Sequence, residues 1–215
     1  MLISLLFTNP LLFLLLAVAF AISISWHEFS HVFSAYLQGD STGKDMGRLS
    51  LNPLRHLDPV GSLLLLFVPF GWGKPAPYNP YNLRNQRYGP LFVALAGPFS
   101  NLILLVVFGT ALHFLAPALG ANNALIMFLQ MLVALNTVLM VFNLIPVPPL
   151  DGSSIIQAIL GPTRPDLLQS FNRYGPPILI GIVMMSFLTN ISLLSFLINP
   201  VLSVVQNIIG VPIGF

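Results

Sequence analysis

One short segment near the start of the chain has residue types and spacing that suit metal-dependent hydrolysis. His27-Glu28-Phe29-Ser30-His31 contains two histidines four residues apart. On a helix, these two imidazoles lie on one face and within reach of a single ion. Glu28 directly follows the first histidine and is the single glutamate of the sequence. Its carboxylate would therefore lie beside the ion, where it could serve as a general base.

The composition places this segment in a membrane. Of the 215 residues, 56% are hydrophobic and 7% are charged, whereas about 25% of residues are charged in soluble domains. We therefore expect an integral membrane protein. Ionisable groups in hydrocarbon are costly and usually functional, which favours a site over two idle histidines. The sequence has no cysteine, so any metal must be held by His, Asp or Glu.

A third ligand must come from elsewhere in the chain, and Asp151 is the candidate. It follows the run Asn143-Leu-Ile-Pro-Val-Pro-Pro-Leu150, which ends an apolar segment. Three prolines in four residues cannot continue a helix, so we expect an extended stretch that directs Asp151 inward. Two alternatives stay open. Asp151 could instead N-cap the helix that follows Gly152, and Asn143 could donate either to an oxyanion or between helices.

The apolar segments predict the fold. A spanning helix needs about 20 mostly apolar residues, and four runs meet that length: 5–38, 91–117, 124–146 and 176–198. The run 60–72 is too short to cross, and 199–215 contains prolines and glycines that favour a partial or interfacial segment. We expect an all-α polytopic membrane protein with about four to six transmembrane helices and a re-entrant segment near 60–72.

The basic residues predict the orientation in the membrane. All eight lie in three loops: Lys44, Arg48 and Arg55; Lys74, Arg84 and Arg87; and Arg164 and Arg173. The positive-inside rule places these loops together on the cytoplasmic side. The segment 60–72 must then return to the side from which it enters. The basic residues form no single basic face of the kind that binds nucleic acid, so we expect no nucleic-acid partner.

Four motifs together resemble the site-2 protease family of intramembrane zinc metalloproteases, in its short prokaryotic core-only type. They are HEFSH at 27–31, GWGKP at 71–75, AGPFSN at 96–101 and NLIPVPPLDG at 143–152, and the resemblance covers about residues 10–160. Members of this family usually carry a further span before the HExxH helix, and from this sequence we expect none.

The resemblance implies what the site does. His27, His31 and Asp151 would hold one zinc ion per chain, Glu28 would be the catalytic base, and Asn143 would bind substrate or the oxyanion. The protein would cleave transmembrane protein substrates in a prokaryotic cell membrane, among membrane lipids, with the active site toward the cytoplasm. We expect one membrane-embedded domain, 1–215, with a core at 10–160 and C-terminal helices at 176–215. The sequence leaves the oligomeric state open.

Two other classes of protein compete with this interpretation. A metal transporter also needs carboxylates and imidazoles inside the membrane, but it should display them along a path open to both sides, often in two related halves. A protease-like scaffold with a purely binding role would have no use for Glu28.

The remaining polar residues are expected to be structural. This group comprises solvated loop aspartates (Asp40, Asp45, Asp58, Asp166), histidines without a ligand role (His56, His113), asparagines that bond between helices (Asn101, Asn136) and a packing kink at Gly97-Pro98.

Overall fold

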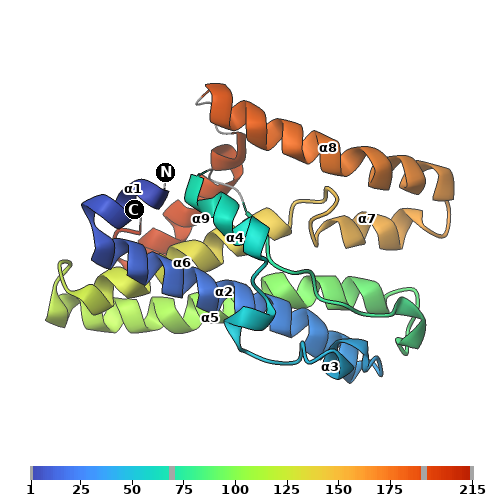
Figure 1. Ribbon diagram of the computed structural model, residues 1–215, viewed down its shortest axis with the longest axis horizontal. Helices are drawn as coiled ribbons and strands as arrows, with labels where there is room; N and C mark the ends of the chain where they lie inside the picture. Colours follow the sequence, from blue (N-terminus) through green and yellow to red (C-terminus); the bar gives the residue numbers. More distant parts are fainter. Residues whose placement is uncertain (1, 68–70, 190–192, 214–215) are drawn as a thin grey trace.

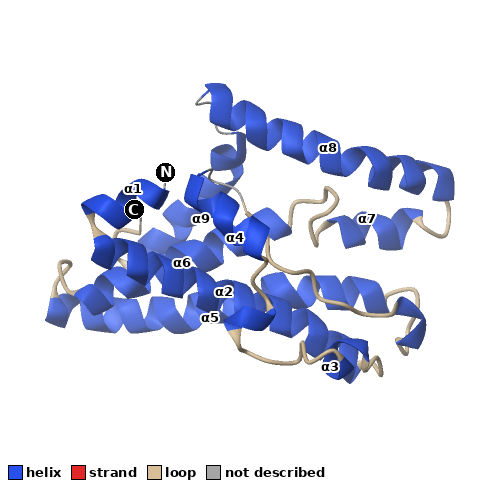
Figure 2. Ribbon diagram, in the orientation of Figure 1, coloured by secondary structure: helices blue, strands red, loops and turns tan. Residues whose placement is uncertain are grey.

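The computed structural model describes residues 2–67, 71–189 and 193–213, and its regular elements there are helices. In chain order they are α1 (Leu2–Thr8), α2 (Pro10–Leu37), α3 (Thr42–Asp45), η1 (Pro53–Arg55), α4 (Pro59–Phe67), η2 (Pro80–Asn82), α5 (Gly89–Leu119), α6 (Ala124–Asn143), α7 (Ser153–Leu160), α8 (Pro165–Thr189) and α9 (Leu193–Ile209). Figure 2 shows only helices joined by loops in this part of the chain. The all-α prediction is confirmed.

Three long helices, α2, α5 and α6, form the body of the protein and lie side by side (Figure 1). Each is long and apolar enough to cross a membrane, since about 20 residues at 1.5 Å each span the hydrocarbon. Their shared core contains fully buried aliphatic side chains, among them Leu112, Ile126, Leu132 and Val133. Gly120 makes the positive-φ turn between α5 and α6, so these two helices run antiparallel.

The predicted fourth span at 176–198 is wrong. The structure divides this run between α8, which begins earlier at Pro165, and α9; residues 190–192 between them lie outside the described part. The first half of α8 is polar, so its apolar length is too short for a full span. In Figure 1, α8 runs apart from the three-helix body, although a Cβ on Gly175 would touch the Pro148 side chain.

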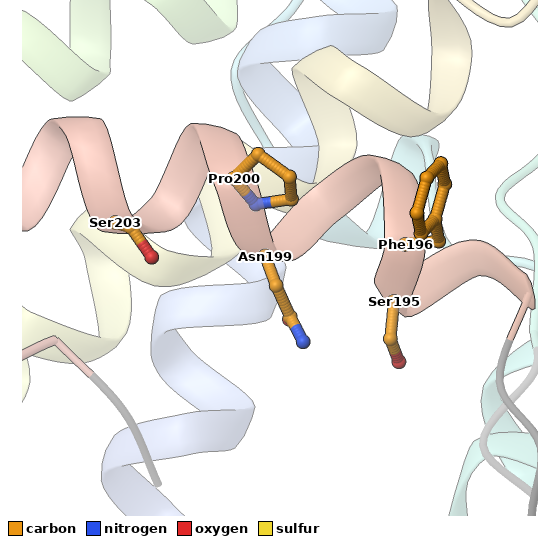
Figure 3. Close-up of a pocket in the computed structure, with 5 residues that line it drawn as sticks. All are labelled: Ser195, Phe196, Asn199, Pro200 and Ser203. Atoms are coloured by element: carbon orange, nitrogen blue, oxygen red, sulfur yellow. The ribbon is translucent and has the colours of Figure 1, made fainter.

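The tail is also more regular than its prolines suggest, because α9 continues through Pro200 to Ile209. A proline inside a helix removes one hydrogen bond, but Leu202, Val205 and Ile209 pack on the core and offset that loss. Another face of α9 carries polar residues: Ser195, Asn199 and Ser203 recur every four residues and point the same way (Figure 3). This helix is amphipathic, unlike an all-apolar span.

The short apolar segment after residue 58 returns to its starting point, as the re-entrant prediction requires. Helix α4 has nine residues, about 13 Å of helix, and the Asp58 carboxylate caps it by accepting from the amides of Val60 and Gly61. After residues 68–70, which lie outside the described part, Gly73 pairs with Leu57. The Lys74 amide then donates to the His56 carbonyl at 2.7 Å.

Asp40 is not the solvated loop charge that its position suggests, because only 1% of its surface is exposed. Its carboxylate accepts from the amide and hydroxyl of Thr42, from the Asn79 amide and from the Asn82 side chain. Burial raises the pKa of this carboxyl, but these donors outweigh burial and hold the pKa below its ordinary 3.8. Asp40 thereby ties the end of α2 to the loop that precedes α5.

We predict that Asp40→Ala lowers the free energy of unfolding by about 3 kcal/mol, because hydrogen bonds to charged groups contribute about 1.5–3 kcal/mol each. Denaturant titration in detergent measures this change. Because the pKa is lowered, the stabilisation is present above about pH 4 and is lost as the pH falls below it. The control is Asp45→Ala, which removes an exposed carboxylate bonded to Ser41; equal losses from both variants would contradict the assignment.

Candidate metal centre

His27 and His31 lie one turn apart on α2 and are both buried. Their Nε2 atoms are 3.0 Å apart, and their rings meet edge to face with centroids 4.6 Å apart. The i, i+4 spacing of the HExxH pattern therefore directs both imidazoles to one point, as the sequence predicts.

The structure brings Asp151 to the same point, although it lies 120 residues further along the chain. Its Oδ2 is 3.2 Å from Nε2 of His27 and 3.4 Å from Nε2 of His31. One ligand atom from each of these three residues lies within 4.8 Å of the other two. The Asp151 carboxylate does not cap α7, which has no side-chain cap; its backbone carbonyl instead accepts from the amide and hydroxyl of Ser154.

A buried chain of hydrogen bonds orients His27. The Asn136 side chain donates to Ser23 Oγ and to the Leu132 carbonyl, and its oxygen accepts from Asn101 Nδ2 at 2.9 Å. The Asn101 amide oxygen is thus left to face His27 Nδ1 at 2.6 Å. Because this oxygen can only accept, Nδ1 of His27 carries a proton, and in the neutral imidazole Nε2 then presents its lone pair.

His31 is oriented in the same sense by the backbone of α5. Its Nδ1 lies 2.7 Å from the Val93 carbonyl oxygen, which can only accept, so Nε2 again presents its lone pair. One turn further along α2, the Ser34 hydroxyl donates to the Phe92 carbonyl. These two bonds hold α2 against the start of α5.

The donor set fits a zinc ion. Both Nε2 lone pairs face each other and Asp151 Oδ2, which is buried without a hydrogen-bond donor among the described residues. Three electron-rich atoms so close together repel one another unless a cation lies between them. Two imidazoles and one carboxylate, without thiolates, are a typical set for catalytic zinc, and they leave a fourth position open.

Gly97 makes the close approach of α5 to the imidazoles possible. A Cβ at this position would lie 2.5 Å from His31 Nε2 and 2.6 Å from His27 Cε1, closer than any real contact allows. The sequence predicts only a packing kink at Gly97-Pro98. Both residues lie inside α5, and Gly97 also forms one wall of the metal centre.

Glu28 is buried beside a small lobe formed by residues 48–57 and 71–75. A Cβ on Gly73 would lie 3.6 Å from Glu28 Oε1 and 3.1 Å from the His56 carbonyl oxygen, so these groups share one corner. Arg48 donates to the Lys74 carbonyl at 2.7 Å and thereby fixes the lobe. Both Arg48 and His56 interact electrostatically with Glu28.

His56 is a neutral, fully buried part of this lobe and lies outside the cluster of His27, His31 and Asp151. Burial lowers the pKa of His56, and the Arg48 charge lowers it further against the opposing effects of the Ser50 carbonyl and Glu28. Nε2 therefore donates to the Ser50 carbonyl. His113 likewise lies outside the cluster and bonds to the Ile209 carbonyl at the end of α9.

The loop before Asp151 is a series of turns, so the predicted extended stretch is wrong. The amides of Val147 and Leu150 bond locally, and the Gly152 amide closes the loop on the Asn143 carbonyl at 2.7 Å. Prolines have no backbone N–H, so the loop has few amide donors, and these donate to carbonyl oxygens of the loop itself and of Asn143. The Asn143 side chain donates to the Leu139 carbonyl of its own helix, which leaves its second amide hydrogen available.

Two roles in this centre were missed by sequence reasoning. Asn101 and Asn136 do bond between helices, as predicted, yet the same bonds also fix the tautomer of His27. The available signal was the presence of two amide side chains in apolar runs, since polar groups inside a membrane seldom lack a function. Which histidine they serve depends on how the helices pack.

Comparison with known proteins adds an independent finding. The model of "Peptidase family M50" matches residues 115–188, a range that includes Asp151. The chain is 39% identical over 166 residues to "Putative zinc metalloprotease YwhC" of Bacillus subtilis, covering 74% of this chain and 75% of the relative. No solved structure matches the chain.

Two mycobacterial relatives share the name "Putative zinc metalloprotease Rip2". The protein of Mycolicibacterium smegmatis is 33% identical over 169 residues, which is 76% of this chain and 64% of the relative. That of Mycobacterium tuberculosis H37Rv is 32% identical over 160 residues, 70% of this chain and 59% of the relative. The chain therefore spans less than two thirds of either Rip2 protein.

We predict that Gly97→Ala weakens zinc binding by at least about tenfold, the scale on which disturbed ligand orientation reduces metal affinity. The added methyl group must displace one imidazole or both. Competition with a chelator in detergent measures the affinity. Gly181→Ala is the matched control, because it adds the same group to a helix with nothing within 4 Å. Unchanged zinc affinity in the Gly97 variant would contradict the packing argument.

Proposed function

Because the chain belongs to peptidase family M50, the site-2 proteases, and is thus a zinc-dependent membrane metalloprotease, we propose that it hydrolyses peptide bonds within or near transmembrane segments of other proteins. In this proposal His27, His31 and Asp151 hold the zinc ion and Glu28 is the general base. The observation that carries it is the convergence of the three ligand atoms within 4.8 Å, with Glu28 one residue from a ligand.

The proposed reaction is hydrolysis without a covalent intermediate. When bound, zinc polarises the scissile carbonyl and makes water a better nucleophile near neutral pH. Glu28 takes a proton from the attacking water and delivers it to the leaving amine. Two observations support this role: Glu28 directly follows the ligand His27, and it is buried with Oε1 close to Gly73 of the lobe.

A helical substrate must unwind before it can be cut, since its carbonyls are bonded within the helix. We propose that the unwound strand is held by the re-entrant segment, the Pro-rich loop, or both, through strand addition. The isolated bridge between Gly73 and Leu57 supports the first, because it shows that the backbone after the re-entrant segment can pair as a strand does. Asn143, with one amide hydrogen available, is proposed to donate to the oxyanion.

We also propose that the site faces the cytoplasm of a prokaryotic cell. The basic residues of 44–55 and 74–87 lie in the loops that join the C-terminal end of α2 to the N-terminal end of α5. His31 lies six residues before the end of α2, about 9 Å along the helix axis. The metal centre is therefore near the end of the body that carries the basic loops.

We predict that topology reporters fused within 39–59 and within 73–90 both respond as cytoplasmic, because the segment between them returns to its starting point. A reporter in the turn at 120–123 serves as the control and should respond as external. Opposite responses from the first two fusions would rule out the re-entrant topology.

We predict that Glu28→Gln keeps about one zinc per chain but reduces cleavage by about 10²- to 10⁴-fold, the usual contribution of a general base. Asp151→Ala should lose the metal as well as activity, because only two protein ligands are left. The measurements are zinc content and cleavage in detergent of a transmembrane substrate with a weak helix. Asp166→Ala, which removes an acidic residue from the first turn of α8, is the matched control and should change neither quantity.

The outcomes separate the competing functions. Normal cleavage by Glu28→Gln would exclude the proposed mechanism. A wild-type protein that binds zinc without cutting would favour a metal-binding or transport role, and one that binds no zinc would contradict the metal centre itself.

A further inference from the structure

The face of α2 that carries Glu28 is covered by two backbone segments. Ile24, Glu28 and Val32 are spaced four residues apart, so they lie on one face of the helix. A Cβ on Gly73 would lie 3.3 Å from Cγ1 of Ile24 and 3.6 Å from Oε1 of Glu28. A Cβ on Gly43 would lie 2.6 Å from Cγ1 of Val32. Both segments therefore lie directly against this face, each through a glycine.

Arg48 joins these two segments to each other. Its amide donates to the Gly43 carbonyl at 2.8 Å, and its Nη2 donates to the carbonyl of Lys74, the residue after Gly73, at 2.7 Å. The Nε of Arg48 is buried, so the guanidinium reaches into the lobe and its Nε is shielded from solvent. Arg48 thus fixes the backbone at Gly73 relative to the backbone at Gly43.

The other bonds of the Gly73 segment stay inside the lobe. The Lys74 amide donates to the His56 carbonyl at 2.7 Å, and Gly73 forms its bridge with Leu57. These contacts hold the lobe together, but they do not tie it to the segment at Gly43. The Arg48 side chain makes that connection.

Glu28 depends on this backbone for its position. The residue is buried, yet among the described residues its carboxylate has no hydrogen bond or ion pair. This leaves both carboxylate oxygens free to accept a proton, as a general base requires. It also means that packing, without a bonded partner, restricts the side chain. Gly73 is part of that packing.

We propose that Arg48 is a positioning residue for the reaction, which holds the Lys74 carbonyl and thereby keeps the Gly73 backbone against the Glu28 carboxylate. This inference rests on the proposed function. Arg48 acts through the backbone and touches neither substrate nor the reacting atoms. Without its bond, the Gly73 segment moves away from α2 and Glu28 occupies additional rotamers. Only part of the population then has the geometry that proton transfer needs.

The alternative role for Arg48 is stabilisation of the fold alone, and three variants separate the two roles. Arg48→Met removes the charge and every donor but keeps an unbranched side chain. Arg48→Lys keeps the charge and a donor for one carbonyl. Arg55→Met is the matched control, because it makes the same change on an exposed arginine of the same lobe.

Gly73→Ala disturbs the same corner without changing Arg48. Its added Cβ would lie 3.1 Å from the His56 carbonyl oxygen and 3.3 Å from Cγ1 of Ile24. These contacts are tight, so the backbone at residue 73 must shift away from α2. This variant tests the proposed route through the backbone independently of the arginine.

The experiment measures zinc content, and kcat and KM on one transmembrane substrate, in detergent. We expect Arg48→Met to keep one zinc per chain and an unchanged KM and to lose about 10- to 100-fold in kcat, less than removal of the base itself. Arg48→Lys should recover kcat to within about threefold of wild type. Gly73→Ala should lower kcat at unchanged KM, and Arg55→Met should match wild type.

A double-mutant cycle identifies the group through which Arg48 acts. If Arg48 works by positioning Glu28, its loss has little further effect once that carboxylate is gone. Arg48→Met should therefore change the residual kcat of Glu28→Gln by less than about twofold. A purely structural role would lower kcat by the same factor in both backgrounds.

Four results would overturn the inference: wild-type kcat in Arg48→Met or in Gly73→Ala, loss of zinc from Arg48→Met, equal losses of kcat in Arg48→Met and Arg55→Met, or a full further loss in the Glu28→Gln background. Each requires a wild type that cuts. A wild type that holds zinc and never cuts, or normal cleavage by Glu28→Gln, refutes the proposed function instead.

Discussion

Two imidazoles with nitrogens 3.0 Å apart inside an apolar helix bundle are the constraint on which the rest of the structure depends. The two Nε2 atoms can stay so close only if each ring donates a hydrogen bond from Nδ1 and the two Nε2 atoms share a cation. The acceptors for Nδ1 come from α5: the Asn101 side chain and the Val93 carbonyl. The packing of α2 against α5, and the absence of a side chain at Gly97, follow from that requirement.

The same requirement extends through the third helix and the loop after it. Asn136 of α6 determines which end of the Asn101 amide faces His27, so three helices together determine one tautomer. The loop that follows α6 folds on itself and closes at Gly152. This brings the Asp151 carboxylate close to Nε2 of both rings. Each spanning helix thus supplies either a ligand, a ring orientation or the loop that positions a ligand.

Sequence reasoning predicted the parts of this arrangement that are local. The i, i+4 histidines and Glu28 are set by helix geometry alone, and the return of the segment after residue 58 follows from its length and the basic loops. Asp151 as a ligand was supported mainly by family resemblance, because the residues themselves also allowed an N-cap. Contacts between distant segments were not predictable: nothing local shows that Asn101 serves His27.

Two predictions were wrong because they concern residues whose environment is determined by contacts between distant segments. Asp40 was expected in solvent because it follows a helix end in a charged loop, but the loop before α5 covers it and supplies its donors. The apolar run 176–198 was expected to cross the membrane because its composition allows it. Hydropathy shows only that a segment can lie in hydrocarbon. The ends of α8 and α9 also depend on tertiary packing, and α9 packs against α5 and α6.

X-ray absorption at the zinc edge of the purified protein tests the central claim most directly, because it reports the atoms bound to the ion. The account predicts one zinc per chain with two imidazole nitrogens at about 2.0–2.1 Å, the rest of the shell being oxygen. Asp151→Ala, which is expected to lose the ion, should not give this spectrum, whereas Asp166→Ala should reproduce it. A spectrum with fewer than two imidazoles, or one that Asp151→Ala leaves unaltered, would contradict the proposed centre.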